Sequence, residues 1–136
     1  MADGAGADLP GAAARLAGIA DALGESAWSE ELRRSGVTPA PQPTPPTWGE
    51  IAITGIDVVE GLAAGGDWEQ ARHQAAFLAD FFTRMRTRLH GVAGVAFEGL
   101  ALAARARDRD ELCAHAELIR ELFGTGDARV VSGGGP

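Results

Sequence analysis

The sequence lacks lysine, tyrosine and asparagine altogether, and it contains a single cysteine, Cys113. One cysteine excludes an intramolecular disulfide framework and a zinc site built from several thiolates. Without lysine there can be no Gly-x-x-x-x-Gly-Lys phosphate loop, and no Gly-x-Ser-x-Gly nucleophile motif occurs. No apolar run approaches the ~20 residues of a membrane-spanning helix, and the N-terminus lacks the basic-then-apolar order of a signal peptide. A soluble, cytoplasmic protein is therefore expected.

What the chain does contain is an ordinary globular balance, because 46% hydrophobic and 23% charged residues disfavour wholesale disorder. The formal net charge of −7 disfavours general nucleic-acid binding, which depends on basic side chains that neutralise phosphates. The excess of alanine, glycine, arginine and proline is typical of a GC-rich genome, and a bacterial source is expected.

Basic residues are nevertheless concentrated in one stretch, whose acidic residues are only Glu98 and Asp108. Such a concentration indicates either a basic patch for an acidic protein, a cofactor phosphate or RNA, or the solvated faces of two helices. The arginines concerned are Arg84, Arg86, Arg88, Arg105, Arg107 and Arg109.

The first part of the chain is predicted to be a helical segment after a short disordered start. Residues 1–7 are small and featureless, which is typical of a disordered terminus. Within the N-terminal helical segment, residues 8–36, apolar side chains recur at helical spacing. The spacing predicts a helix over about 9–34, which Gly24 could break into two pieces.

A proline-rich linker, residues 37–46, follows this segment. It contains five prolines, which lack an N–H donor and bias the preceding residue away from helical geometry. Such a run is extended, and at ~3.1 Å per residue it spans about 30 Å. The N-terminal helix is therefore predicted to be tethered, so that it can dock on its own chain or on a partner.

Residues 47–124 are predicted to form a helical bundle domain, and residues 125–136 a flexible tail. Three capping boxes mark helix starts, because the first side chain of each can accept from an early amide. These boxes are Thr47-x-x-Glu50, Asp67-x-x-Gln70 and Asp108-x-x-Glu111. Gly91 and Gly94 are expected to end the second of these helices. The predicted helices cover about 48–64, 68–89, 93–106 and 109–123.

The helix predicted at 68–89 has the clearest apolar pattern. Phe77 and Phe81 add a second stripe to this helix, which indicates neighbours on two sides. The fold class is therefore predicted to be all-α: a compact four-helix unit of two antiparallel hairpins plus the tethered N-terminal helix. The main stripe alternates three and four apart through Trp68, Ala71, Ala75, Leu78, Phe82, Met85 and Leu89.

One turn in this region resembles a known repeat. The run Gly65-Gly66-Asp67-Trp68-Glu69-Gln70-Ala71, within residues 65–75, is similar to the inter-helix turn of tetratricopeptide repeats. The resemblance implies packing of helical hairpins and binding of other proteins. A faint internal duplication aligns residues 66–73 with 108–115 at a shift of 42, whereas the tetratricopeptide period is 34.

Two Glu-x-x-x-His pairs are the candidate metal ligands. Glu69 and His73 form one pair, and Glu111 and His115 form the other. A small-ligand or metal-binding bundle could use them, but the apolar pattern places these side chains on the outer faces of their helices. No cofactor is expected, and Cys113 is expected to be a small buried hydrophobe rather than a nucleophile.

A second alternative is catalytic. The spacing of Arg109 and His115 resembles the arginine–histidine spacing of helical nucleases of the HEPN type. The resemblance implies metal-free RNA cleavage by these two residues, whereas the acidic balance of the chain disfavours RNA.

The interpretation that best fits these patterns is a non-catalytic accessory or adaptor subunit. It would bind a protein partner, or a second copy of itself, through an apolar helix face and the tethered N-terminal helix. Nucleic acid and membrane partners are not expected. The residues predicted to contact a partner are Leu16, Ile19, Leu23, Trp28, Trp48, Phe77 and Phe81.

Overall fold

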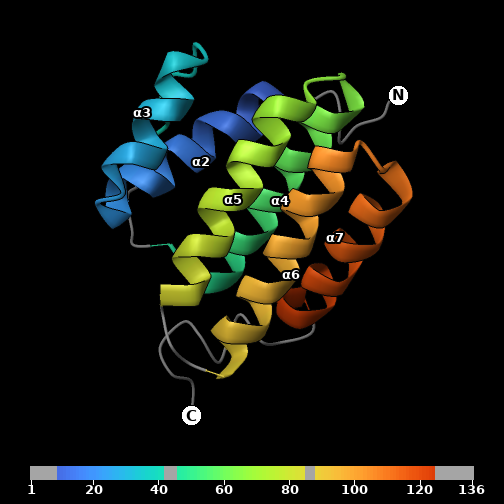
Figure 1. Ribbon diagram of the computed structural model, residues 1–136. Coiled ribbons are helices and arrows are strands. Elements are labelled where there is room, and N and C mark those ends of the chain that lie inside the picture. Colours follow the sequence, from blue (N-terminus) through green and yellow to red (C-terminus); the bar gives the residue numbers. More distant parts are fainter. Residues whose placement is uncertain (1–8, 42–45, 85–87, 125–136) are drawn as a thin grey trace.

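The structure, a computed structural model, describes residues 9–41, 46–84 and 88–124, and within these ranges every regular element is an α-helix (Figure 1). The predicted all-α class is confirmed. The predictions for residues 1–7 and 125–136, and for part of the proline-rich linker, lie outside the described residues. The helices are α2 (Leu9–Leu23), α3 (Ser26–Arg34), α4 (Trp48–Ala64), α5 (Trp68–Arg84), α6 (Arg88–Ala106) and α7 (Arg109–Gly124).

The N-terminal segment breaks where the sequence predicts a break. Gly24 has a φ of +76°, a left-handed conformation that glycine adopts without steric cost. The amide of Glu25 then donates to the carbonyl of Ala20 at 2.9 Å and closes the end of α2. As a result α3 folds back on α2 instead of continuing it (Figure 1).

The same segment is docked on the rest of the chain. Helix α2 lies against α4, and Leu16 and Ala17 are completely buried there. Gly61 of α4 permits the close approach, because a Cβ at that position would lie 2.9 Å from Cδ1 of Leu9. The linker begins along α2, where the amide of Ala40 donates to the carbonyl of Ala14 at 2.9 Å.

The three predicted helix starts are all capped. At Thr47 the box is complete: the hydroxyl accepts from the Glu50 amide at 3.0 Å, and the Glu50 carboxylate accepts from the Thr47 amide at 2.9 Å. Asp67 accepts from the amide of Gln70, and Asp108 accepts from the amide of the residue three further on, Glu111, both at 3.2 Å. The local capping signal therefore predicts the helix starts well.

The glycines of the following region do not break a helix, so that part of the prediction is wrong. Helix α5 ends at Arg84, and α6 begins at Arg88 and runs through Gly91 and Gly94. A Cβ at Gly94 would lie 2.5 Å from Oγ1 and 3.1 Å from the backbone nitrogen of Thr83. Gly94 therefore serves the packing of α6 on α5, a tertiary role that a local reading mistakes for a helix stop.

The core is centred on the ring of Phe82, which lies close to aromatic side chains of α4, α5, α6 and α7. Its centroid lies 6.2 Å from that of Trp48 of α4, 5.4 Å from Phe97 of α6 and 5.6 Å from Phe123 of α7. Phe81, its neighbour on α5, lies edge-on at 5.4 Å. In agreement with these contacts, α4 packs on α5 and α7, and α6 packs on α5 and α7.

The two turns that enter α5 and α7 have the same backbone geometry. The amides of Gly66 and Asp67 donate back to the end of α4 at 3.0 and 2.8 Å, and those of Arg107 and Asp108 do so at the end of α6 at 3.1 and 2.9 Å. Gly66 and Arg107 both have positive φ. The turns are therefore 41 residues apart, and the shift of 42 read from the sequence is wrong by one. In consequence His73 and His115 do not occupy equivalent positions.

Candidate interaction surface

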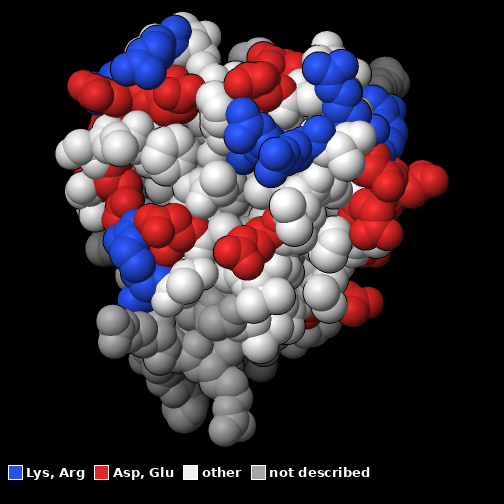
Figure 2. All heavy atoms as spheres, in the orientation of Figure 1, with Lys and Arg blue, Asp and Glu red and all other residues white. Residues whose placement is uncertain are grey.

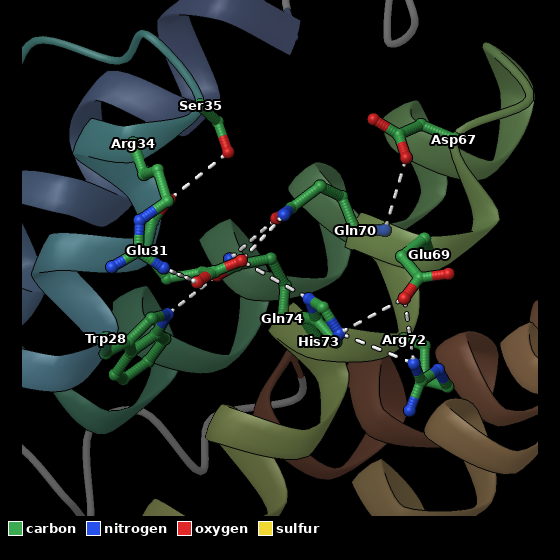
Figure 3. Close-up of polar contacts among 10 residues, drawn as sticks. All are labelled: Trp28, Glu31, Arg34, Ser35, Asp67, Glu69, Gln70, Arg72, His73 and Gln74. Carbon is green, nitrogen blue, oxygen red and sulfur yellow. Dashed lines mark hydrogen bonds and ion pairs between the residues drawn. The ribbon is translucent and has the colours of Figure 1, made fainter.

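Helix α3 is held on α5 by a buried hydrogen bond between Trp28 and Gln74 (Figure 3). The indole Nε1 of Trp28 donates to Oε1 of Gln74 at 2.7 Å, and both side chains are buried. The indole also stacks on Phe77, with ring centroids 6.1 Å apart and an interplanar angle of 8°. A buried indole N–H that finds an acceptor avoids the cost of an unpaired donor, so this contact stabilises the docked α3.

Glu31 extends the contact between α3 and α5 at the molecular surface. Its carboxylate accepts from Nε2 of Gln70 at 2.8 Å and lies 3.3 Å from Nδ1 of His73 (Figure 3). The hydrogen bond from Gln70, followed by the contact with His73, lowers the pKa of Glu31 below its ordinary value. Arg34 of the same helix adds an ion pair at 3.2 Å. The carboxylate thus joins the two helices while it is charged.

The residues predicted to contact a partner lie against the chain itself. Four of them are buried, and the other three are partly buried and packed on the core. In this arrangement they belong to the packing between the helices of the chain itself, because an apolar stripe in the sequence does not show which surface will cover it. The buried four are Leu16, Ile19, Trp28 and Phe81, and the other three are Leu23, Trp48 and Phe77.

Each predicted Glu–His pair forms, but as a contact on a helix surface. His73 lies 3.7 Å from Glu69, and His115 lies 3.4 Å from Glu111. Both glutamates are exposed. Among the residues that the structure describes, no group of three or more His, Cys, Asp or Glu side chains could hold a metal ion.

Arg109 and His115 are not brought together. Arg109 donates from Nη2 to the carbonyl of Ala63 at the end of α4, at 3.3 Å. His115 instead lies over Gly99 of α6, where a Cβ would be 2.5 Å from its Cε1 atom. The two side chains of the predicted nuclease pair therefore contact different neighbouring helices.

Cys113 is exposed, so the expectation that it is buried is wrong. It follows Leu112, which is the buried residue of this helical turn. With Arg109, Asp57 and Glu60 it lines a shallow hollow of about 220 Å³ between α4 and α7. Arg120 crosses between the same two helices, where its Nη2 lies 2.6 Å from Glu60, and this carboxylate raises the pKa of the guanidinium.

The arginine-rich stretch is divided between structural and exposed roles. Arg84 binds Glu25, the residue that precedes α3, and Asp80 of α5, each at 2.9 Å. Arg105 and Arg107 are exposed beside Arg72, and Figure 2 shows basic side chains at its upper centre and right, where α5 begins and α6 ends. The side chains of Arg86 and Arg88 lie outside the described residues.

The structure reveals an apolar surface that the predicted partner-binding residues did not include. Within the described part of the chain, the exposed large hydrophobic side chains are Val92, Val95 and Leu102 of α6 and Leu118 of α7. Their exposed fractions are 46%, 68%, 63% and 44% respectively. A single exposed valine is ordinary, but three on one helix at helical spacing form a continuous face.

We call this face the α6 stripe, and it runs along one side of the helix at spacings of three and four residues. Figure 2 shows a largely uncharged surface along the course of α6. The α6 stripe consists of Val92, Val95, Gly99, Leu102 and Ala106. Leu118 continues it on α7, because it lies one turn after His115, the residue that covers Gly99.

A signal for the α6 stripe is present in the sequence. The opposite side of α6 is also apolar and fills the core, with Ala93, Phe97, Leu100 and Ala104 buried. A helix that is apolar on two opposite faces is typical of one covered on both, so the apolar residues opposite the core positions predict a second covering surface. The predicted function, by contrast, relied on side chains of the N-terminal helix and α5, together with Trp48.

Comparisons with protein-family models, with curated proteins and with solved structures find no match to this chain. Its function is therefore inferred from its residues. None of the described helices is both long enough and apolar enough to cross a membrane.

Proposed function

We propose that this protein is a non-catalytic helical adaptor that binds another protein chain through the α6 stripe. The observation that carries the proposal is the exposure of Val95 and Leu102, at 68% and 63%, on the same face of one helix. Burial of such side chains in an interface is favourable by roughly 25 cal/mol for each Å² of apolar surface removed from water.

The way the rest of the chain packs supports this choice of surface. Helices α2 and α3 cover the side of α4 and α5 that lies away from α6 and α7 (Figure 1). We infer that α4 to α7 act as one four-helix unit and that the tethered N-terminal helices, α2 and α3, cover one side of this unit. The α6 stripe is then the face available to a partner.

The placement of the polar candidates is consistent with a binding role. His73 and Arg109 make contacts between helices, with Glu31 and with the end of α4 respectively. His115 lies beside the α6 stripe rather than with Arg109. Groups that act together in catalysis have to converge on one reacting centre, whereas these groups are distributed over the surface.

Site-specific photo-crosslinking in the cells that produce the protein tests the proposal. A photoreactive phenylalanine analogue replaces Leu102 in one variant and Val92 in another, and Ala76 serves as the matched control. Ala76 is exposed on α5, at the hollow beside Glu31 and Phe77, away from the α6 stripe. We expect discrete protein adducts from positions 92 and 102 and none from position 76. Equal or absent crosslinking at all three positions would refute the proposal.

A further inference from the structure

The α6 stripe has the spacing of a coiled-coil seam. Its members follow one another at intervals of three, four, three and four residues, which is the a and d pattern of two successive heptads. Such a seam fits another α-helix that lies nearly parallel or antiparallel to α6. The partner expected from this pattern is therefore a helix rather than a strand or a loop.

Two charges border the seam on one edge. Glu98 and Arg105 are seven residues apart, so they occupy the same heptad position, and both are exposed. Neither forms an ion pair or hydrogen bond with another residue in the part of the chain that the structure describes. The other edge of the seam carries Ala96 and Ala103, which are buried against the core of the same chain.

This distribution of charge favours the antiparallel pairing of α6 with a second copy of itself. When two copies of α6 pair antiparallel, the same edge of each helix meets, so Glu98 of each copy faces Arg105 of the other. A parallel pair would instead oppose this edge to the one with Ala96 and Ala103, and the charges would have no counterpart. Charge complementarity of α6 with itself thus selects a two-fold antiparallel pair.

The same register determines which apolar residues of the two copies face one another. When Glu98 and Arg105 face one another, Leu102 of each copy lies opposite Gly99 of the other, and Val95 lies opposite Ala106. At Gly99 the surface that Leu102 of the other copy meets includes the ring of His115, because this ring occupies the direction in which a Cβ of Gly99 would point.

We propose that the partner bound by the α6 stripe is a second copy of this chain, with the two α6 helices antiparallel about a two-fold axis. This inference rests on the proposed function and names its partner. Leu102 is the central anchor, and the pairs between Glu98 and Arg105 fix the register. The seam covers only a few helical turns, so the dimer is a reversible one whose population depends on protein concentration.

Sedimentation equilibrium of the purified full chain over a concentration series tests the self-association. The wild type is expected to dimerise, and Leu102→Glu is expected to raise the dissociation constant at least about tenfold, because it places a carboxylate at the centre of the seam. Ala76→Glu adds the same charge to α5 and should leave the dissociation constant unchanged. Circular dichroism of each variant establishes that the helices are intact.

A charge-exchange cycle tests the antiparallel orientation. Glu98→Arg and Arg105→Glu should each raise the dissociation constant about threefold or more, since each opposes like charges across the axis. The double variant restores opposite charges and should return to within about twofold of the wild type. A double variant no better than the single variants would overturn the antiparallel pairing.

The outcomes separate this inference from the proposed function. A wild-type chain that stays monomeric up to its solubility limit overturns the self-association. If position 102 then crosslinks to a different protein in cells, the adaptor function stands and only the identity of the partner is wrong. A monomer with no crosslinks from the α6 stripe refutes both.

Discussion

The indole nitrogen of Trp28 lies 2.7 Å from the side-chain oxygen of Gln74, and this hydrogen bond joins residues 46 positions apart in the chain. Gln74 is completely buried, and it is the largest polar side chain in the interior of the described residues. The contact links the N-terminal helices to α5. It makes the docking of α3 depend on one specific polar pair as well as on apolar area.

Removal of the acceptor should destabilise the protein. Gln74→Leu keeps a similar volume but leaves the Trp28 N–H buried without a partner, which costs about 1–3 kcal/mol. Urea unfolding followed by circular dichroism measures this loss of unfolding free energy. In a Trp28→Phe background the donor is absent, so the same substitution should cost clearly less. Equal losses in both backgrounds would show that the hydrogen bond does not account for the stability supplied by Gln74.

Gly94 should not tolerate a methyl group. Alanine usually stabilises a helix relative to glycine by about 1 kcal/mol. At Gly94 the added Cβ would lie 3.1 Å from the backbone nitrogen of Thr83, which cannot move without separating α5 from α6. We expect Gly94→Ala to lower the unfolding free energy by roughly 1–3 kcal/mol. Gly65→Ala is the control, because its nearest neighbour would be 3.6 Å away, and it should change stability by less than about 1 kcal/mol.

Gly99 and His115 should show energetic coupling. In the wild type, Gly99→Ala would place a Cβ 2.5 Å from Cε1 of His115, so the ring has to move away from its contact with Glu111. In a His115→Ala background this obstacle is gone, and the substitution should stabilise α6 by up to about 1 kcal/mol. Thermal unfolding of the four proteins of this cycle measures the coupling. Additive effects would mean that His115 does not lie over Gly99.

The lowered pKa of Glu31 makes the docking of α3 sensitive to acid. The hydrogen bond from Gln70, then the contact with His73, stabilises the ionised carboxylate, so the folded-state pKa lies below the unfolded value of about 4.3. The stabilisation is complete above the unfolded value and is lost as the pH falls through the folded value. Glu31→Gln should therefore lose stability relative to wild type near pH 7, with the difference shrinking below about pH 4.

Urea unfolding over a pH series measures this dependence. Gln70→Ala removes the main cause of the lowered pKa of Glu31. The unfolding free energy of this variant should therefore fall less steeply with decreasing pH than that of the wild type. If the wild type and Glu31→Gln lost stability in parallel as the pH fell, Glu31 would not be the group responsible.

The features predicted correctly from the sequence are those set by local chemistry. The caps at Thr47, Asp67 and Asp108 bind amides within the next turn, so a few adjacent residues contain the whole signal. The break at Gly24 is local in the same sense. Gly94 was misread because its reason lies in Thr83 of another helix, which no short window of sequence reveals.

The surface that covers an apolar stripe is determined by distant parts of the chain. Leu16 and Trp28 were predicted to meet a partner, and in the structure they are covered by α4 and α5 of the same chain. The reverse holds for Val95 and Leu102, which remain exposed because no described segment crosses α6 on that side. The sequence shows which side chains are apolar, and only the packing of whole helices shows which of them are left over.

The most direct test of the central claim is the accessibility of the α6 stripe in cells. In a Cys113→Ser background, which removes the single native thiol, Val95→Cys reports on the α6 stripe and Ala76→Cys reports on open solvent. The ratio of their maleimide labelling rates is compared between intact cells and dilute purified protein. We predict that the residue at position 95 is labelled several-fold more slowly than the one at position 76 in cells, and that dilution abolishes this protection. An identical ratio in cells and in dilute solution would contradict the claim that another chain covers α6.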